Sequence, residues 1–387
     1  MNHILIILFF IIIFLIINSY IIYPILVQLL SLFVSHKKYD ETTFHPVSIL
    51  ISAYNEEKVI ESRVMNLLNQ DYDLNKIEIL IGSDCSDDRT NDILIGLSKK
   101  ISNLQIFLFN ERRGKGAVLN DLVSHARNEI LIFTDANTTF AKDAIKKLTI
   151  HFNDSKIGGV SGKLILIEDR LSFYDGVEEQ KYWNYENFIK KSEGNLGILI
   201  GANGGIFAIR KELYANIPID KPVTDDFFIS IAVLKKGYKF VYEADALATE
   251  SIAKDLEIEF KRKVRFAATN FQTISFFKSL LLNKNILLSY ALWSHKILRW
   301  FVPILLLMLF ILNMILINYS PILTYIFYIQ ILFYSLAFLG YVLLKLKIRI
   351  IPLTLSFYFL MSNYALLLGL LNFLKKKHSL KWQSTPR

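Results

Sequence analysis

The chain has 387 residues, of which 53% are hydrophobic, and its formal net charge is +9. This apolar content is high for a soluble protein and points to membrane spans. The excess of lysine and arginine then suits a protein held beside anionic lipid head groups. A nucleic-acid partner is not expected, because the basic residues form no long runs. A single cysteine, Cys85, excludes an intrachain disulfide and a cysteine-rich zinc site.

Residues 1–36 are predicted to form an N-terminal transmembrane anchor. Residues 4–34 carry no charge and exceed the roughly 20 residues that a helix needs to cross a bilayer. The run is too long for a signal-peptide core and lacks a basic start. Pro24 is expected to kink the helix or to end the true span. The basic residues at 36–38 then place the next segment on the cytoplasmic side.

Residues 37–273 have the composition of a globular domain. Short apolar, β-branched runs predict strands, and the segments between them predict helices. This alternation indicates an α/β fold with a mostly parallel sheet and helices on both faces. The expected strands are residues 47–53, 77–82, 105–109, 129–134, 160–166 and 205–209, and the expected helices are residues 56–70, 90–100, 115–126 and 174–192.

Acidic clusters follow several of these segments in order. Asp84 and Asp135 each come directly after a predicted strand, and Asp225 and Asp226 stand later in the chain. Carboxylates at the ends of strands in an α/β sheet lie where ligands bind. Followed by the basic cluster at 262–265, this series indicates an enzyme that handles a charged, metal-bound donor and an acceptor held at the bilayer.

Residues 300–374 are predicted to form about three further transmembrane helices. The charge-free block 300–344 is long enough for two spans, and residues 318–321 are suited to the turn between them. The block 350–374 fits one span.

Residues 274–299 mix apolar and basic side chains, among them Lys296 and Arg299, and are expected to lie along the membrane interface. The basic tail, residues 375–387, raises a conflict. A full crossing by the preceding block would put this tail outside, against the usual distribution of positive charge. The sequence therefore leaves open whether that block crosses and on which side the C-terminus lies.

A set of short motifs stands in order along residues 46–266. The first half has residues 48–57, Asp84-x-Ser86-x-Asp88-x-Thr90, residues 114–120 and residues 133–137, and the second half has residues 201–210, residues 224–226 and Arg262-x-x-Arg265-Phe266. The ordered set resembles a family 2 glycosyltransferase of the membrane-embedded branch, which includes the synthases of cellulose, hyaluronan and poly-N-acetylglucosamine. The resemblance implies a GT-A fold, with a Rossmann-like nucleotide-binding domain, and inverting transfer from a UDP-sugar.

The resemblance assigns the nucleotide to the first half. Tyr54 and Glu56 are expected to line its pocket, and Asp84 resembles the uridine-binding aspartate of the family. Lys115 is expected to reach the base or the phosphates. Both charged residues have ordinary alternatives, since Asp84 could cap the next helix and Lys115 could be a solvated lysine in a turn. Cys85 stands where the family usually has glycine and is assigned no chemistry.

The segment Asp135-Ala136-Asn137 resembles the Asp-x-Asp motif of the family. The resemblance therefore implies a divalent cation, Mg²⁺ or Mn²⁺, with Asp135 as its ligand. Asn137 replaces the second aspartate, and its amide oxygen can still coordinate a cation, but without charge. Taken alone, the same three residues would equally suit an Asx turn that ends a strand.

Asp226 is the predicted general base, which accepts the proton of the acceptor hydroxyl as that oxygen attacks the anomeric carbon. A single displacement of this kind inverts the anomeric centre. The family usually has Thr-Glu-Asp here, and this chain has Asp225 in the middle position. The alternative for the acidic pair is an N-terminal helix cap together with Thr224.

Two groups of residues are assigned to the acceptor. Backbone at the glycine-rich segment is expected to approach the acceptor sugar closely, at Gly201, Asn203 and Gly204. Arg262, Arg265 and Phe266 resemble the Gln/Arg-x-x-Arg-Trp motif, whose cations lie near the diphosphate and whose aromatic ring lies at the acceptor end. Phe266 lacks the N–H donor of tryptophan. An interfacial basic helix is the alternative for this segment.

The leading hypothesis for function is a plasma-membrane synthase with a cytoplasmic catalytic domain, which adds sugar from a UDP-sugar to a growing polysaccharide. The first alternative is non-processive transfer of one sugar to a lipid acceptor. The few predicted spans favour this alternative, because they leave a narrow channel unless the protein associates with itself or a partner subunit. A remote alternative is an inactive assembly partner that binds polysaccharide or nucleotide. The sugar, the linkage and the oligomeric state are left open.

Overall fold

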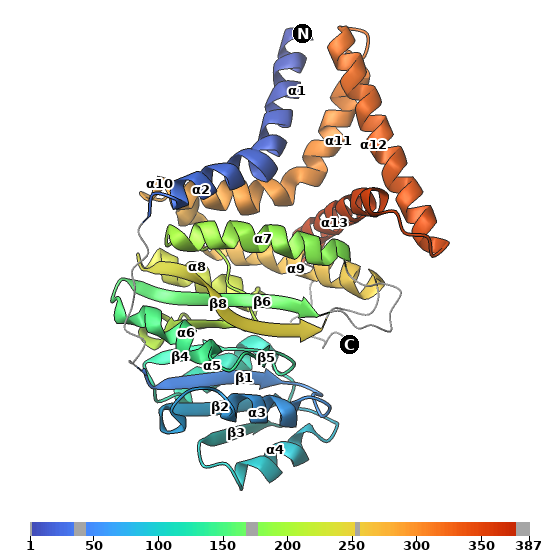
Figure 1. The fold of residues 1–387 in the computed structure, drawn as a ribbon. Helices are drawn as coiled ribbons and strands as arrows, with labels where there is room; N and C mark the ends of the chain where they lie inside the picture. The colour runs from blue at the N-terminus through green and yellow to red at the C-terminus, as the bar shows by residue number, and fades with distance from the viewer. Residues whose placement is uncertain (1, 35–43, 168–176, 252–255, 377–387) are drawn as a thin grey trace.

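The computed structural model describes residues 2–34, 44–167, 177–251 and 256–376. Figure 1 shows the protein as a stack of layers. The strands and helices α3 to α6 form the lower part, helices α7, α8 and α9 lie above the sheet, and the long apolar helices fan out beyond them. The middle layer therefore separates the sheet from the helices that are apolar enough for a membrane.

The strands form a single sheet in the order β3-β2-β1-β4-β7-β6-β8-β5. The β1–β2, β2–β3, β1–β4 and β6–β8 pairs are parallel, and β7 runs antiparallel to both β4 and β6. The strands are β1 Val47–Ala53, β2 Ile77–Asp84, β3 Leu104–Phe109, β4 Ile130–Phe133, β5 Thr139–Phe140, β6 Ile157–Ile167, β7 Phe207–Arg210 and β8 Lys239–Ser251.

The central strands are buried because helices cover both faces of the sheet. Every residue of β2 is buried, which fits the continuous apolar runs expected of parallel strands. The covering helices in this half are α3 Ile60–Leu68, α4 Thr90–Ser98, α5 Lys115–His125 and α6 Ala144–Thr149. The predicted α/β fold with a mostly parallel sheet and helices on both faces is confirmed.

The strands and helices in the second half of the domain were harder to predict from the sequence. Strands β5 and β8 were not predicted, and β8 alternates buried and exposed positions because only one of its faces packs on the core. Three helices lie over this half: α7 Val177–Asn195, α8 Asp225–Lys235 and α9 Leu256–Phe276. They carry many of the charged residues that line the site described below.

Four helical segments among the described residues are long and apolar enough to cross a membrane, namely His3–Ser31, Ile286–Leu316, Pro321–Lys345 and Ile351–Leu374. The first contains α1 Asn2–Ile17, the π-helical turn η1 Asn18–Ile22 and α2 Tyr23–Ser31. The second contains α10 Ile286–Ala291, the π-helical turn η6 Leu292–Ile297 and α11 Leu298–Leu316. The others are α12 Pro321–Lys345 and α13 Ile351–Leu374, and a short 3₁₀ segment, Lys278–Leu282, follows α9.

The first apolar segment bends where the sequence predicted a kink. Pro24 occupies the first turn of α2, directly after η1, and Figure 1 shows α1 and α2 at a clear angle. The side chain of Asn18 in η1 donates to Ser294 Oγ at 3.0 Å and accepts from the Tyr290 hydroxyl at 2.7 Å. Buried polar side chains at the bend therefore tie the first apolar segment to the second.

Helix α13 packs closely on α9 through Gly369. A Cβ atom added at Gly369 would lie 2.3 Å from Ala267 Cβ and 2.8 Å from the Val264 carbonyl oxygen. We expect Gly369→Ala to lower the free energy of unfolding by about 1–3 kcal/mol, because backbone must move to admit the methyl group. Thermal unfolding of the purified protein in detergent measures the change.

Gly96→Ala is the matched control for this substitution. Gly96 lies in α4, and a Cβ atom added there meets nothing within 4 Å. This control should unfold at the wild-type temperature or slightly above it, since alanine favours a helix by roughly 0.5–1 kcal/mol over glycine. Equal unfolding temperatures for both variants would contradict the close packing of α13 on α9.

Candidate active site

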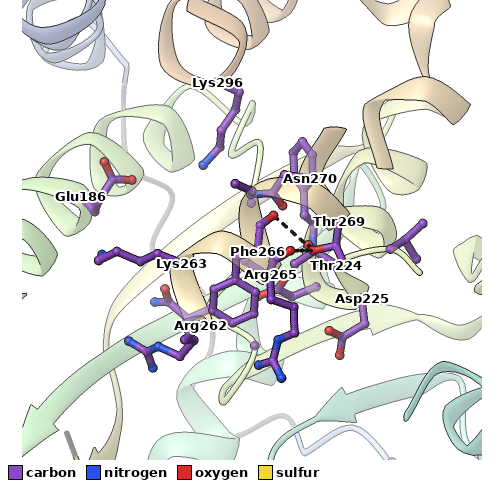
Figure 2. Close-up of a pocket in the computed structure, with 18 of the residues that line it drawn as sticks. Glu186, Thr224, Asp225, Arg262, Lys263, Arg265, Phe266, Thr269, Asn270 and Lys296 are labelled. Atoms are coloured by element: carbon purple, nitrogen blue, oxygen red, sulfur yellow. Dashed lines mark hydrogen bonds between the residues drawn. The ribbon is translucent and has the colours of Figure 1, made fainter. Parts of the chain in front are cut away.

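A cavity of about 770 Å³ lies between the sheet and the apolar helices. It begins at Lys115 and Asp135, passes the glycine-rich segment and the start of α8, and reaches Leu355 and Leu366 of α13. Figure 2 shows its charged middle part, with side chains from α7, α8, α9 and η6 facing a common space. Ten of the residues predicted from the sequence line this cavity: Lys115, Asp135, Gly201, Asn203, Gly204, Asp225, Asp226, Arg262, Arg265 and Phe266.

Asp84 lies behind the cavity wall and shapes the loop in front of it. Its carboxylate accepts hydrogen bonds from the backbone N–H groups of Arg113, at 2.7 Å, and Gly114, at 2.9 Å, both of which line the cavity. Gly114 has a φ of +88°, a left-handed conformation that glycine adopts without strain. Cys85 also has a positive φ, +59°, which explains physically why glycine is usual at this position.

Tyr54 and Glu56 also lie behind this loop. The guanidinium of Arg112 stacks on the Tyr54 ring, 3.6 Å from its centroid. The backbone N–H of Glu56 donates to Thr90 Oγ1 at 2.8 Å, which links the loop after β1 to the start of α4. Tyr54 therefore packs on the loop that precedes Lys115, whereas Glu56 joins the loop after β1 to α4.

Lys115, the first residue of α5, joins the two halves of the predicted site. Its Nζ lies 2.8 Å from Asp135 Oδ1, after β4, and 2.8 Å from Asp225 Oδ2, at the start of α8. Burial opposes the charge of Lys115, but the two carboxylates outweigh it and raise its pKa above the ordinary value. From the sequence, Lys115 could equally have been a solvated lysine in a turn. In the structure it lies between two carboxylates that line the cavity.

The acidic groups near Asp135 fit a cation that a substrate helps to hold. Within the described residues, no three His, Cys, Asp or Glu side chains gather as an all-protein metal site. Mg²⁺ commonly binds through one or two carboxylates together with substrate phosphates, so Asp135 suits such a cation. The amide nitrogen of Asn137 lies 3.5 Å from Oε1 of Glu250, which lines the cavity. Glu250 therefore brings a carboxylate beside the residue that replaces the second aspartate.

Asp226 is partly buried at the N-terminus of α8. Burial and the neighbouring carboxylate of Asp225 raise its pKa to about 6. Its Oδ1 accepts the N–H of Phe227 at 2.6 Å, and a Cβ at Gly204 would lie only 3.0 Å from its Oδ2. Thr224 does not cap the helix with its side chain, and instead pairs with the Thr269 hydroxyl at 2.7 Å.

The two arginines of α9 have different surroundings. Arg262 pairs with Glu179 and with Glu259, at 2.7 Å for Glu259, and both of these carboxylates are buried. Arg265 lines the cavity, and burial lowers its pKa below the ordinary value. Phe266 lies beside both guanidinium groups, 6.0 Å from Arg262 and 5.3 Å from Arg265. Arg262 is therefore neutralised by two buried carboxylates, and Arg265 lines the cavity.

A buried ionic network along the wall of the cavity was missed by the sequence reasoning. His295 lies between two glutamates of α7, with Nδ1 2.6 Å from Glu193 and Nε2 3.0 Å from Glu186. Arg299 donates to Glu186 at 2.5 Å, and Tyr23 donates to Glu193 at 2.5 Å. Burial opposes the charge of Glu186, but His295 and Arg299 lower its pKa well below the ordinary value. The network ties α7 to both apolar segments that contain π-helical turns.

The sequence held one signal for this network. His295, Lys296 and Arg299 are ionisable side chains inside a segment apolar enough to cross a membrane, and such residues usually face a protein interior or a cavity. The basic residues of the segment were instead expected to face the interface. In the structure Arg299 is buried and Lys296 lines the cavity.

Comparisons with known proteins agree with this geometry. Residues 48–217 match the profile of the family described as "Glycosyl transferase family 2". Residues 48–217 are therefore similar to a family 2 glycosyltransferase domain. The matched segment includes Asp84, Lys115, Asp135 and the glycine-rich segment, and it ends just before Asp225 and Asp226.

Curated relatives of this domain are found among bacterial proteins. A probable glycosyltransferase, YdaM, of Bacillus subtilis (strain 168) is 27% identical over 238 residues, which cover 58% of this chain and 55% of that protein. A poly-beta-1,6-N-acetyl-D-glucosamine synthase of Staphylococcus aureus (strain COL) is 27% identical over 227 residues, which cover 57% of this chain and 53% of the synthase. The chain thus spans about half the length of the curated relatives it matches.

A solved structure is similar along nearly the whole chain. The mannosyltransferase PcManGT from Pyrobaculum calidifontis, in complex with GDP-Man and Mn²⁺, has a TM-score of 0.71 at 21% identity. The match covers 96% of this chain and 100% of that one. The likeness shows a shared GT-A fold with apolar helices at both ends of the chain.

The buried network makes a prediction about stability. Glu186→Gln removes the negative charge between Arg299 and His295 and leaves a buried guanidinium without its anionic partner. We expect the free energy of unfolding to fall by roughly 3 kcal/mol or more, because breaking one side of a buried pair costs about 3–5 kcal/mol. Thermal unfolding in detergent measures the loss.

Glu61→Gln in α3 is the control for this variant, because Glu61 is exposed and makes no ion pair among the described residues. Its unfolding temperature should match that of the wild type. If Glu186→Gln were as stable as this control, the network would not hold α7 against the apolar helices.

Proposed function

We propose that this chain is an integral-membrane, inverting glycosyltransferase that moves a sugar from a nucleoside diphosphate sugar to an acceptor presented by the membrane. The observation that carries the proposal is the continuous cavity, with Lys115 and Asp135 at one end, Asp226 in the middle and α13 at the other end. Such a cavity lets a donor enter from the sheet side and an acceptor from the side of the apolar helices.

The donor end is suited to a diphosphate. Lys115 and Arg265 both line this end of the cavity, and cations there would stabilise the charge that develops on the leaving group. Arg262 is already paired with Glu179 and Glu259, so we assign it the positioning of α9 rather than a phosphate contact. We propose that Tyr54 and Asp84 act behind the wall, by holding the loop around Lys115, and that Glu56 joins the loop after β1 to α4.

A divalent cation, Mg²⁺ or Mn²⁺, would neutralise negative charge on the diphosphate when it is bound. Asp135 would hold it, and the oxygen of Asn137 and the carboxylate of Glu250 are the nearby groups that could complete its surroundings. The ammonium group of Lys115 is paired with the carboxylate of Asp135 in this structure. It would therefore have to move from that carboxylate toward the phosphates when a donor and a cation bind. Throughout, the second carboxylate contact at Asp225 keeps Lys115 within the cavity.

The transfer itself requires a base beside the anomeric carbon. We propose that Asp226 accepts the proton of an acceptor hydroxyl as that oxygen bonds to the anomeric carbon, while the bond from this carbon to the diphosphate breaks. The nucleoside diphosphate leaves with the bonding electrons, and the configuration inverts. The close approach of Gly204 to Asp226 leaves room for the acceptor oxygen, because no side chain covers the carboxylate from that side.

The membrane end of the cavity favours a lipid acceptor that receives a single sugar. A smaller hollow of about 180 Å³, between α11, α12 and α13, is lined mainly by Pro303, Leu306, Leu307, Leu360 and Leu367. Asn363 lines both this hollow and the main cavity, so the two adjoin. An alkyl chain suits the apolar hollow, and a polar head then reaches Asp226.

Polysaccharide synthesis is the second candidate, and the observation in its favour is the curated relative described as a poly-beta-1,6-N-acetyl-D-glucosamine synthase. For both candidates we propose that residues 37–273 are the cytoplasmic catalytic domain and that residues 1–36 and 300–374 hold it in the plasma membrane. An oligomer or a partner subunit is required only by the polymer hypothesis, because four candidate spans form a narrow path for a growing chain.

The proposal is tested with the purified chain in lipid nanodiscs supplied with Mg²⁺ or Mn²⁺. UDP-sugars are the expected donors, and GDP-mannose belongs in the screen because the similar solved mannosyltransferase was bound to GDP-Man. We expect release of nucleoside diphosphate with one donor and a product one sugar larger than an extracted lipid. Long products would favour the polymer candidate, and no release with any donor would contradict a glycosyltransferase.

Asp226→Asn should abolish turnover while it leaves donor binding nearly unchanged, because the amide cannot accept the proton. We expect a fall in kcat of at least about 100-fold, in line with the usual contribution of a general base. Release of the nucleoside diphosphate measures turnover, and calorimetric titration with the donor measures binding. A wild-type rate in the variant would remove Asp226 from the mechanism.

The pH profile gives an independent reading of the same assignment. Burial raises the pKa of Asp226 to about 6, so the carboxylate becomes protonated, and inactive as a base, as the pH falls through about 6. The rate should therefore be full above pH 7 and decline below it. A rate that stays constant down to pH 5 would show that another group accepts the proton.

A further inference from the structure

The membrane end of the cavity contains two lysines that the mechanism above does not use. We propose that Lys190 and Lys296 form an anion subsite that binds a phosphate group of the acceptor beside Asp226. The inference rests on the proposed function and names the chemical class of its acceptor as a phosphate-bearing one.

Lys190 is a buried cation with little neutralisation. It lies in α7, its exposed fraction is only 7%, and it lines the main cavity. Its ammonium donates to Asn203 Oδ1 at 2.5 Å and lies 5.4 Å from the centre of the Trp183 ring. Among the described residues it makes no ion pair with a carboxylate. Burial and the charge of Lys296 lower the pKa of Lys190 to about 8, although the more distant carboxylates of Glu186, Asp226 and Glu193 act in the opposite direction.

Lys296 reaches the same cavity from a segment that packs on α7 through His295. It lies in the π-helical turn η6, and Figure 2 shows its amine directed into the cavity. The Nζ atom would lie 3.7 Å from a Cβ added at Gly201, and it is 5.9 Å from the centre of the Phe227 ring. Within the part of the chain that the structure describes, Lys296 has no carboxylate partner.

The nearby carboxylates are engaged elsewhere. Glu186 binds Arg299 and His295, and Glu193 binds His295 and accepts from a tyrosine hydroxyl. Asp226 faces Lys190 electrostatically but forms no ion pair with it, and we propose that it serves as the base. Among the described residues, Lys190 and Lys296 thus line one cavity without an ion pair to a carboxylate, and an incoming anion would supply that pair.

Phosphate is the anion that this arrangement fits. Lysine binds phosphate as a compact point charge, and two ammonium groups that line one cavity match a group with several charged oxygens. Asn203 fixes Lys190 next to the glycine-rich segment, where Gly204 adjoins Asp226. A phosphate held there would present a neighbouring acceptor hydroxyl to the base. The donor diphosphate has its own cations, Lys115 and Arg265, on the side of the sheet.

The phosphate could belong to a lipid headgroup or to a soluble molecule, and binding assays separate the two. The full chain in nanodiscs is titrated with a long-chain polyprenyl phosphate, with the matching uncharged polyprenol, with inorganic phosphate and with UDP. We expect the wild type to bind the polyprenyl phosphate at least about tenfold more tightly than the polyprenol, in line with a charge-assisted contact. If inorganic phosphate displaces this lipid, the subsite accepts soluble phosphates too.

Substitution of the lysines decides whether they form the subsite. Lys190→Gln and Lys296→Gln should each weaken polyprenyl phosphate binding by about tenfold or more, and should leave the affinity for UDP within about twofold. Lys190→Arg should restore most of the binding, because it keeps the charge. The controls are Lys191→Gln, one residue further along α7, and Lys284→Gln, since both lysines are exposed.

Three results would overturn the inference: wild-type affinity in both glutamine variants, equal weakening in the exposed controls, or a loss of UDP affinity that matches the loss for the lipid. The last result would assign the lysines to the donor. Because these are binding measurements, they are independent of turnover. Lysine-dependent phosphate binding without sugar transfer would leave the subsite standing while the proposed function failed.

Discussion

The structure depends on a buried set of charges that joins the catalytic domain to the apolar helices. Glu186 and Glu193 project from α7, and His295 and Arg299 meet them from the segment that contains η6. Buried charges are tolerated only when they are paired, so each partner requires the other to be correctly placed. The position of α7 over the sheet and the position of the apolar helices are therefore set together. These buried ion pairs hold α7 against the segment that contains η6, and both elements line the cavity.

A second electrostatic contact organises the opposite end of the cavity. Lys115 lies between Asp135 and Asp225, so the nucleotide half and the acceptor half of the domain meet at one ammonium group. From there to α13 the cavity changes from acidic groups, through the base Asp226, to apolar side chains. A charged donor and a membrane-borne acceptor are thus offered different surroundings within one space. The proposed transfer takes place where these surroundings meet.

The agreement between the sequence predictions and the structure differs from one residue to another. Asp135 and Asp226 were predicted in the site because each stands at the end or the start of a regular element, and both line the cavity. Tyr54 and Asp84 were expected at the nucleotide, yet they support the loop from behind through a ring contact and two backbone hydrogen bonds. Spacing along the chain indicates which strand end a residue occupies, but not whether it forms the surface or the layer beneath it.

The sequence alone determined the alternation of strands and helices, the apolar segments and the order of the motifs, because these follow from local periodicity and from runs of one residue type. Only the tertiary structure decided which charges meet. Lys190 and Lys296 are ordinary lysines in the sequence, and they line the same cavity only because η6 packs on α7 through His295. Electrostatic energy depends on the distance between charges and on their burial, and the spacing of residues along the chain determines neither quantity.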